Sequence, residues 1–67
     1  MDETVKNWIV SDLREHIDDL EGTLENERLW LLGCSTTEEI TCHASNIKQL
    51  CEALDYYNTQ LKTILEA

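Results

Sequence analysis

Apolar residues recur every seven positions through the second half of the chain, in two interleaved series. The first series is Ile40, Ile47, Leu54 and Leu61, and the second is Ala44, Cys51, Asn58 and Leu65. Paired series of this kind are typical of helices that pack side by side with coiled-coil geometry. We therefore expect a helix over residues 36–65. A single polar member such as Asn58 often fixes the register of the packed helices, and the alternative is that it lies near a hydrated helix end.

The first half of the chain shows the same period. Its two series are Val10, Ile17, Leu24 and Leu31, and Leu13, Leu20 and Glu27. They predict a helix that is clear over residues 12–32. Gly33 suits the left-handed position after a helix end. Ser35 with Glu38 matches a capping box, and Thr36 with Glu39 matches it one residue later. Because only a few residues connect the two helices, we expect them to run antiparallel and side by side.

Residues 3–10 allow two predictions. Asp2 suits a helix cap and Glu3 suits the first turn of a helix. Thr, Val, Ile and Trp, which favour strands, nevertheless make up most of the segment. Ser11 and Asp12 also have the character of a fresh helix start. The chain is therefore either two long helices, or a short strand at about residues 3–10 followed by two helices.

Apolar side chains outside the seven-residue series are too many for a bare pair of helices. They are Trp8, Ile9, Leu29, Trp30 and Leu32 in the first helix, and Leu50, Tyr56, Tyr57 and Ile64 in the second. So wide an apolar stripe is typical of a four-helix bundle. We predict a mainly α, homodimeric four-helix bundle of two hairpins. Its dimer or partner interface is predicted to include Trp8, Val10, Ile17, Leu24, Trp30, Ile47, Leu50, Leu54, Tyr56, Tyr57 and Leu61. The alternative for the same residues is a groove for a foreign amphipathic helix.

The size of the chain also favours a second copy. Its 67 residues form a single domain, residues 1–67, and a domain this small is marginally stable alone. Disulfides, a metal or a partner chain are the usual remedies. The chain has an odd number of cysteines, Cys34, Cys42 and Cys51, and shows no export signal. We therefore expect free thiols, buried or half-buried, in a reducing cytosol. Cys42 and His43 are adjacent and do not have the spacing of zinc ligands, so we do not expect a structural metal. Of the three usual remedies, a partner chain remains as the expected source of stability.

The chain is strongly acidic. It has 14 Asp and Glu residues against five Lys and Arg residues, a formal net charge of −9. Asp18, Glu21 and Glu25 follow one another at spacings of three and four, which places them on one side of a helix. We predict that they form an acidic partner face that docks to a basic protein surface, and the alternative is a solvated face that keeps the protein soluble. An acidic surface argues against binding to nucleic acid.

No pattern in the chain indicates catalysis. His16 and His43 are expected far apart along the hairpin, each without a Ser or Cys partner, and no glycine-rich phosphate loop occurs. No apolar run approaches the roughly 20 residues of a membrane span. We therefore expect neither an enzyme nor a cofactor, a metal site or a membrane contact.

Two resemblances bear on function. The hairpin over residues 12–65, with Gly33, Ser35 and the heptads, resembles the short helical-hairpin regulators of the Rop type, which dimerise into four-helix bundles and bind RNA. In size, acidity, odd free cysteines and a possible dimer of a strand and two helices, the chain is also similar to small acidic accessory proteins of temperate bacteriophages, as encoded in the early exo–xis region of lambdoid phages. That second resemblance implies a non-enzymatic protein of the host cytoplasm that acts on host machinery or on lytic development.

The sequence thus predicts a dimeric, non-enzymatic protein-interaction or regulatory protein of the cytoplasm. Its expected partners are a second copy of itself and a host or phage protein. The alternative is a nucleic-acid-binding regulator of the Rop-like hairpin type.

Overall fold

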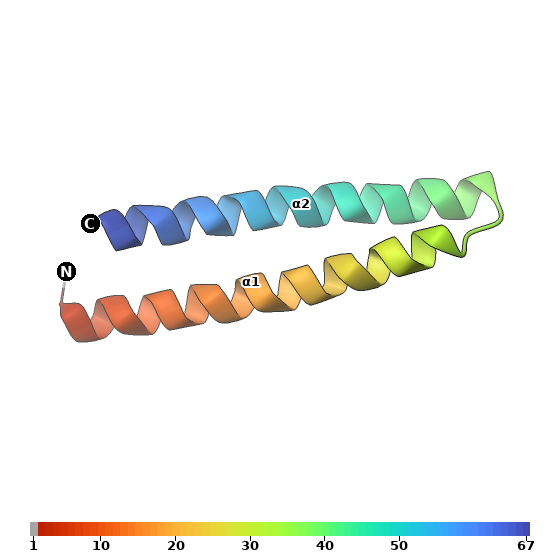
Figure 1. Ribbon diagram of the computed structural model, residues 1–67. Coiled ribbons are helices and arrows are strands. Elements are labelled where there is room, and N and C mark those ends of the chain that lie inside the picture. Colours follow the sequence, from red (N-terminus) through yellow and green to blue (C-terminus); the bar gives the residue numbers. More distant parts are fainter. Residues whose placement is uncertain (1) are drawn as a thin grey trace.

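The computed structural model describes residues 2–67, which form two long helices. α1 spans Glu3–Leu32 and α2 spans Thr37–Glu66. The helices run antiparallel, so the start of α1 and the end of α2 lie together at the end opposite the turn (Figure 1). The hairpin measures 52 × 14 × 11 Å. The predicted mainly α hairpin is confirmed, and the described residues contain no strand.

The strand alternative for residues 3–10 is wrong, because α1 begins at Glu3. The side chain of Asp2 caps the helix: its Oδ1 accepts hydrogen bonds from the backbone N–H groups of Thr4, at 2.7 Å, and Val5, at 3.4 Å. These bonds satisfy amides that have no partner inside the helix. Val10 is buried within the hairpin. Burial of this apolar position outweighs the strand preference of the segment.

The turn joins the helices in four residues, numbers 33–36. Gly33 was expected in the left-handed region but has φ −91° and ψ −2°, a conformation open to any residue. Its N–H donates to the carbonyl of Trp30 at 3.0 Å, which ends α1 with a tight turn. α2 begins with a cap at Thr36, whose Oγ1 accepts from the N–H of Glu39 at 3.2 Å. Of the two predicted capping pairs, the structure therefore uses the second.

The buried core lies along α1 at the predicted positions. Val10, Ile17 and Leu24 are the buried apolar residues, and Glu27 is buried with them. Leu13, Leu20 and Leu31, from the same two series, are half-buried. Both series predicted for the first half of the chain therefore face α2. We call this line of contact between the helices the seam.

On α2, three of the four residues of the first predicted series lie in the seam, and the second series does not. Ile40, in the first turns of the helix, is 45% exposed. Ile47, Leu54 and Leu61 are half-buried, whereas Ala44, Cys51, Asn58 and Leu65 are exposed. Their place in the seam is taken by the residues one position earlier, which are His43, Leu50, Tyr57 and Ile64. The second series was therefore wrong by one residue. Larger side chains at the earlier positions remove more apolar area from water than Ala44 and Cys51 could.

Asn58 consequently does not fix the register of the hairpin. Its side chain is exposed, and its Nδ2 donates to the carbonyl of Leu54 in the same helix at 2.9 Å. This is a local bond within one helix. The polar residue that is buried in the seam is Glu27, on the other helix.

Candidate functional site

A buried carboxylate marks the seam near the turn. Glu27 is 8% exposed and is the one buried charged residue of the described chain. Its Oε2 lies 2.6 Å from Nδ1 of His43, and its Oε1 accepts from Nδ2 of Asn46 at 3.5 Å. The ring of Trp30 packs at a tilt on that of His43, with 5.7 Å between centroids. Two donors from α2 thus compensate a carboxylate that burial alone would disfavour.

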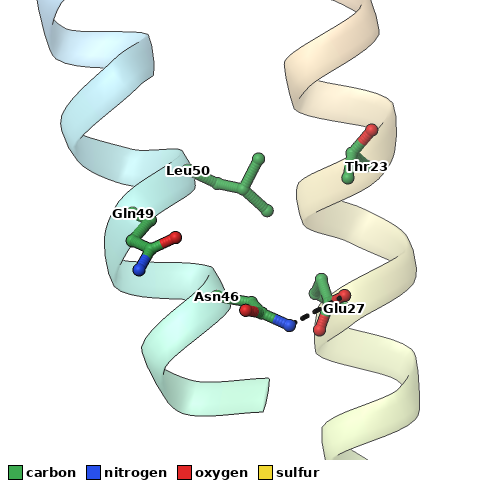
Figure 2. Close-up of a pocket in the computed structure, with 5 residues that line it drawn as sticks. All are labelled: Thr23, Glu27, Asn46, Gln49 and Leu50. Atoms are coloured by element: carbon green, nitrogen blue, oxygen red, sulfur yellow. Dashed lines mark hydrogen bonds between the residues drawn. The ribbon is translucent and has the colours of Figure 1, made fainter. Parts of the chain in front are cut away.

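A pocket opens beside this carboxylate, between the two helices (Figure 2). Its volume is about 250 Å³, and it is lined by Thr23, Glu27, Asn46, Gln49 and Leu50. Figure 2 shows Leu50 and Asn46 pointing from α2 toward α1, with Glu27 facing Asn46 across the seam. The lining therefore combines one apolar side chain, Leu50, with four side chains that can form hydrogen bonds, a combination that accepts an amphipathic group.

Aromatic side chains continue the pocket along one face of the hairpin. Residues seven apart share a helix face, so Trp30 follows Thr23, and Tyr56 and Tyr57 follow Gln49 and Leu50. We call this surface the aromatic face. It comprises Ile9, His16, Trp30, Leu50, Tyr56 and Tyr57 together with the pocket.

Two rings of the aromatic face remain largely in water. Trp30 is 60% exposed and Tyr56 is 61% exposed. The rings of His16 and Tyr57 stack across the seam, with centroids 5.7 Å apart and planes within 9°. Tyr56 meets Tyr57 edge-on at 5.4 Å. These contacts organise the rings but leave Trp30 and Tyr56 uncovered in a single chain.

The residues predicted for the dimer or partner interface divide into three groups. The seam of a single hairpin already covers Val10, Ile17, Leu24, Ile47, Leu54 and Leu61 wholly or in part. The aromatic face carries Trp30, Leu50, Tyr56 and Tyr57. Trp8 is 68% exposed and lies away from both, in line with Leu29 on the side of α1 opposite the seam. Only the second group therefore forms one continuous surface open to a partner.

The predicted acidic face lies on the other flank of α1. Asp18 and Glu25 each follow a buried seam residue, whereas His16 and Thr23 precede one, and successive helical residues point about 100° apart. Asp18, Glu21 and Glu25 are all exposed, and we call them the acidic ridge. Across residues 2–67, the contact between His43 and Glu27 is the sole contact within 4.0 Å between a carboxylate and a basic side chain. The ridge therefore carries uncompensated negative charge.

The three thiols are free and differ in their surroundings. Cys42 and Cys51 are exposed, which corrects the expectation of buried or half-buried thiols, while Cys34 is half-buried at the turn. Partial burial raises the pKa of the Cys34 thiol, and the negative groups of Glu39, Cys42 and Glu27 raise it further. Cys42 lies on the side of α2 that carries the aromatic face, seven residues before Gln49. Cys51 follows Leu50 and so points to the other flank.

His43 is one of the site residues that sequence reasoning missed, with Ile9, His16, Thr23, Glu27, Asn46 and Gln49. It lies seven residues before Leu50 and fourteen before Tyr57, so a period drawn through the largest side chains would have placed it in the seam. In the seam His43 contacts Glu27, which is the one acidic residue in the two seven-residue series of α1.

Residues 2–67 hold no cluster of three or more side chains that could ligate a metal. Neither α1 nor α2 has a stretch apolar enough to cross a membrane. Comparison with protein-family models, with curated proteins and with solved structures gives no match.

Proposed function

We propose that the protein is a non-enzymatic interaction protein that works as a homodimer. The observation that carries this proposal is the area left in water. The hairpin exposes 5078 Å², whereas a compact monomer of 7.8 kDa exposes about 4,400 Å². The excess of about 700 Å² is close to the roughly 800 Å² that each partner buries in a standard protein interface.

The aromatic face is where this excess area is best covered. Exposed aromatic rings around a cleft are the usual centre of a protein interface, because they bury a large area at a small cost in side-chain entropy. No residue of α2 is fully buried in the single hairpin. Its seam residues are only half-buried, because α1 alone covers them. A second copy is the occupant we propose, and packing of the two hairpins gives the predicted four-helix bundle.

The acidic ridge provides the second interaction. Packing through the aromatic face leaves Asp18, Glu21 and Glu25 in water on the other flank of each copy. A row of unpaired carboxylates attracts and orients a basic protein surface. We propose that the dimer presents two such ridges to a protein partner. In the bacteriophage setting that the resemblance implies, that partner is a host or phage protein.

Capture experiments with charge reversal test the ridge. The tagged protein is incubated with bacterial lysate, and captured proteins are identified by mass spectrometry for the wild type and for D18K/E21K/E25K. The matched control reverses three exposed acids of α2, as E38K/E52K/E66K. We expect a defined partner that is lost with the ridge variant, retained with the control and weakened by salt. Equal capture by both variants, or none by the wild type, would contradict ridge docking.

A further inference from the structure

We propose that the two hairpins of the dimer pack face to face through their aromatic faces and run in opposite directions, so that the turn of one lies at the chain ends of the other. The ring of Tyr56 of the partner subunit then fills the pocket beside Glu27. This inference rests on the proposed dimer and adds the face, the orientation and the occupant of the pocket. It requires the partner copy to complete a site that a single chain leaves open.

The positions of the features along the hairpin carry the orientation. When one hairpin is turned end for end over the other, Thr37 and Glu66 exchange levels. Tyr56, ten residues before Glu66, then faces residue 47, ten residues after Thr37. That level is the pocket, which α2 lines with Asn46, Gln49 and Leu50. By the two-fold symmetry of a dimer, both pockets receive a tyrosine at once.

The same reversal covers the other exposed ring. Trp30, two residues before the end of α1, comes to face Val5, two residues after its start. Val5 is an exposed apolar residue four positions before Ile9, which belongs to the aromatic face. A single rotation therefore places an apolar neighbour on Trp30 and an aromatic ring in the pocket.

A parallel dimer through the same face matches these features poorly. Each pocket would lie against the other pocket, at the same level, and neither Tyr56 would reach it. The two Glu27 carboxylates would approach each other across the interface, and like charges brought together out of water oppose association. Trp30 would lie at the level of the first turn of α2, which holds Glu38 and Glu39. The antiparallel arrangement avoids all three conflicts.

The pocket has the size and chemistry for a phenol ring. A cavity of about 150 Å³ is large enough for benzene, and this pocket measures about 250 Å³. Leu50 supplies an apolar wall for the ring. Each carboxylate offers about four acceptor positions, of which Glu27 uses two, so its oxygens can accept a further bond from the Tyr56 hydroxyl. Tyrosine can contact Leu50 with its ring and Glu27 with its hydroxyl, using one side chain.

A spin-label distance tests the orientation. The three native cysteines are replaced by serine, Ser35 at the turn is replaced by cysteine, and a nitroxide is attached there. In the antiparallel dimer the two turns lie at opposite ends, so we expect a distance close to the 52 Å length of the hairpin. In a parallel dimer the turns lie side by side, about 10–20 Å apart, which is one to two helix diameters. A distance nearer to that value overturns the proposed orientation.

The mass of the labelled sample separates the two proposals. A dimer with a short label distance overturns the antiparallel arrangement and leaves the proposed function standing. A monomer overturns both, provided that circular dichroism shows the helices intact. The wild-type chain, with its native cysteines, gives the reference mass.

A hydroxyl deletion tests the pocket independently of the label. We expect Tyr56→Phe to raise the dimer dissociation constant roughly tenfold, as for loss of a hydrogen bond to a charged group. Ser45→Ala is the control, because Ser45 is exposed and lies two residues from the seam residues His43 and Ile47, on the side of α2 away from the seam. It should leave the constant unchanged. The effect of Tyr56→Phe should shrink when Glu27 is replaced by Gln, because the two groups interact. Additive effects of the two changes would exclude contact between them.

Discussion

The two flanks of the hairpin are formed by the same helices, but one exposes aromatic rings and the other exposes carboxylates. The aromatic face carries Trp30 and Tyr56 in water beside a pocket whose buried polar atoms all have partners within the described chain. The acidic ridge carries three carboxylates and no cation within 4.0 Å. Exposed apolar area gains free energy when it is covered, whereas a carboxylate loses hydration when it is buried. Covering the aromatic face therefore lowers the free energy, whereas the acidic ridge is stable in water.

The largest expected effect separates Trp30 from Trp8. Both rings are mostly exposed in a single chain, but Trp30 lies on the aromatic face and Trp8 lies away from it. We expect Trp30→Ala to raise the dimer dissociation constant at least about thirtyfold, the effect of losing about 2 kcal/mol at an interface centre. Trp8→Ala should change it little. Sedimentation equilibrium measures both constants, and equal effects would mean that the aromatic face is not the interface.

A second comparison sets the buried glutamate against a ridge glutamate. Glu27→Ala removes the acceptor for His43 and Asn46 and enlarges the pocket, so we expect the free energy of unfolding to fall by about 2 kcal/mol. Glu25→Ala, on the exposed ridge, should change it by less than about 0.5 kcal/mol. Urea denaturation at one fixed protein concentration measures both. Similar losses for the two variants would remove the energetic distinction between the flanks.

The native thiols report on the two flanks without any mutation. At pH 8 we expect Cys34 to be alkylated most slowly, because its raised pKa leaves less of it as the reactive thiolate. Raising the protein concentration should slow the alkylation of Cys42, beside the aromatic face, and leave that of Cys51 unchanged. Mass spectrometry of digests taken over time gives the three rates. Equal protection of Cys42 and Cys51 would place the interface elsewhere.

The smallest expected effect is on the ridge itself. Glu21→Gln relieves repulsion from Asp18 and Glu25, which lie three and four residues away along the helix. We expect the free energy of unfolding to rise by a few tenths of a kcal/mol, about 0.2–0.5 for each like-charge pair removed. The gain should shrink in concentrated salt, since the charges are exposed and screened. Thermal unfolding at low and high ionic strength checks this, and a loss of stability would contradict simple repulsion.

The helices and their antiparallel packing could be predicted because the periodic signal is strong on α1. Val10, Ile17 and Leu24 follow it without exception, and the structure buries all three. The start of α1 could not be decided, because the strand preference of residues 3–10 competed with a single capping residue, Asp2. Packing against α2 along the whole length of the hairpin stabilises the helix at residues 3–10, and the local propensities of these residues do not reflect that packing.

The candidate site was harder to predict because it depends on one residue of register. On α2, a series through Ala44 and Cys51 and a series through His43 and Leu50 both have a period of seven. Choosing the first series placed Tyr57 outside the seam and left His43 without a role. The rotation of α2 that the structure adopts brings His43 to Glu27 and opens the pocket between the helices. Only contacts across the seam distinguish the two choices.

The absolute mass in solution tests the central claim most directly. Light scattering is measured over a roughly hundredfold dilution of the wild-type chain, down to low micromolar concentration. We expect a mass of twice 7.8 kDa, that is 15.6 kDa, at the higher concentrations. A folded chain of 7.8 kDa at every concentration would contradict the account, because the aromatic face would then stay in water without a second copy.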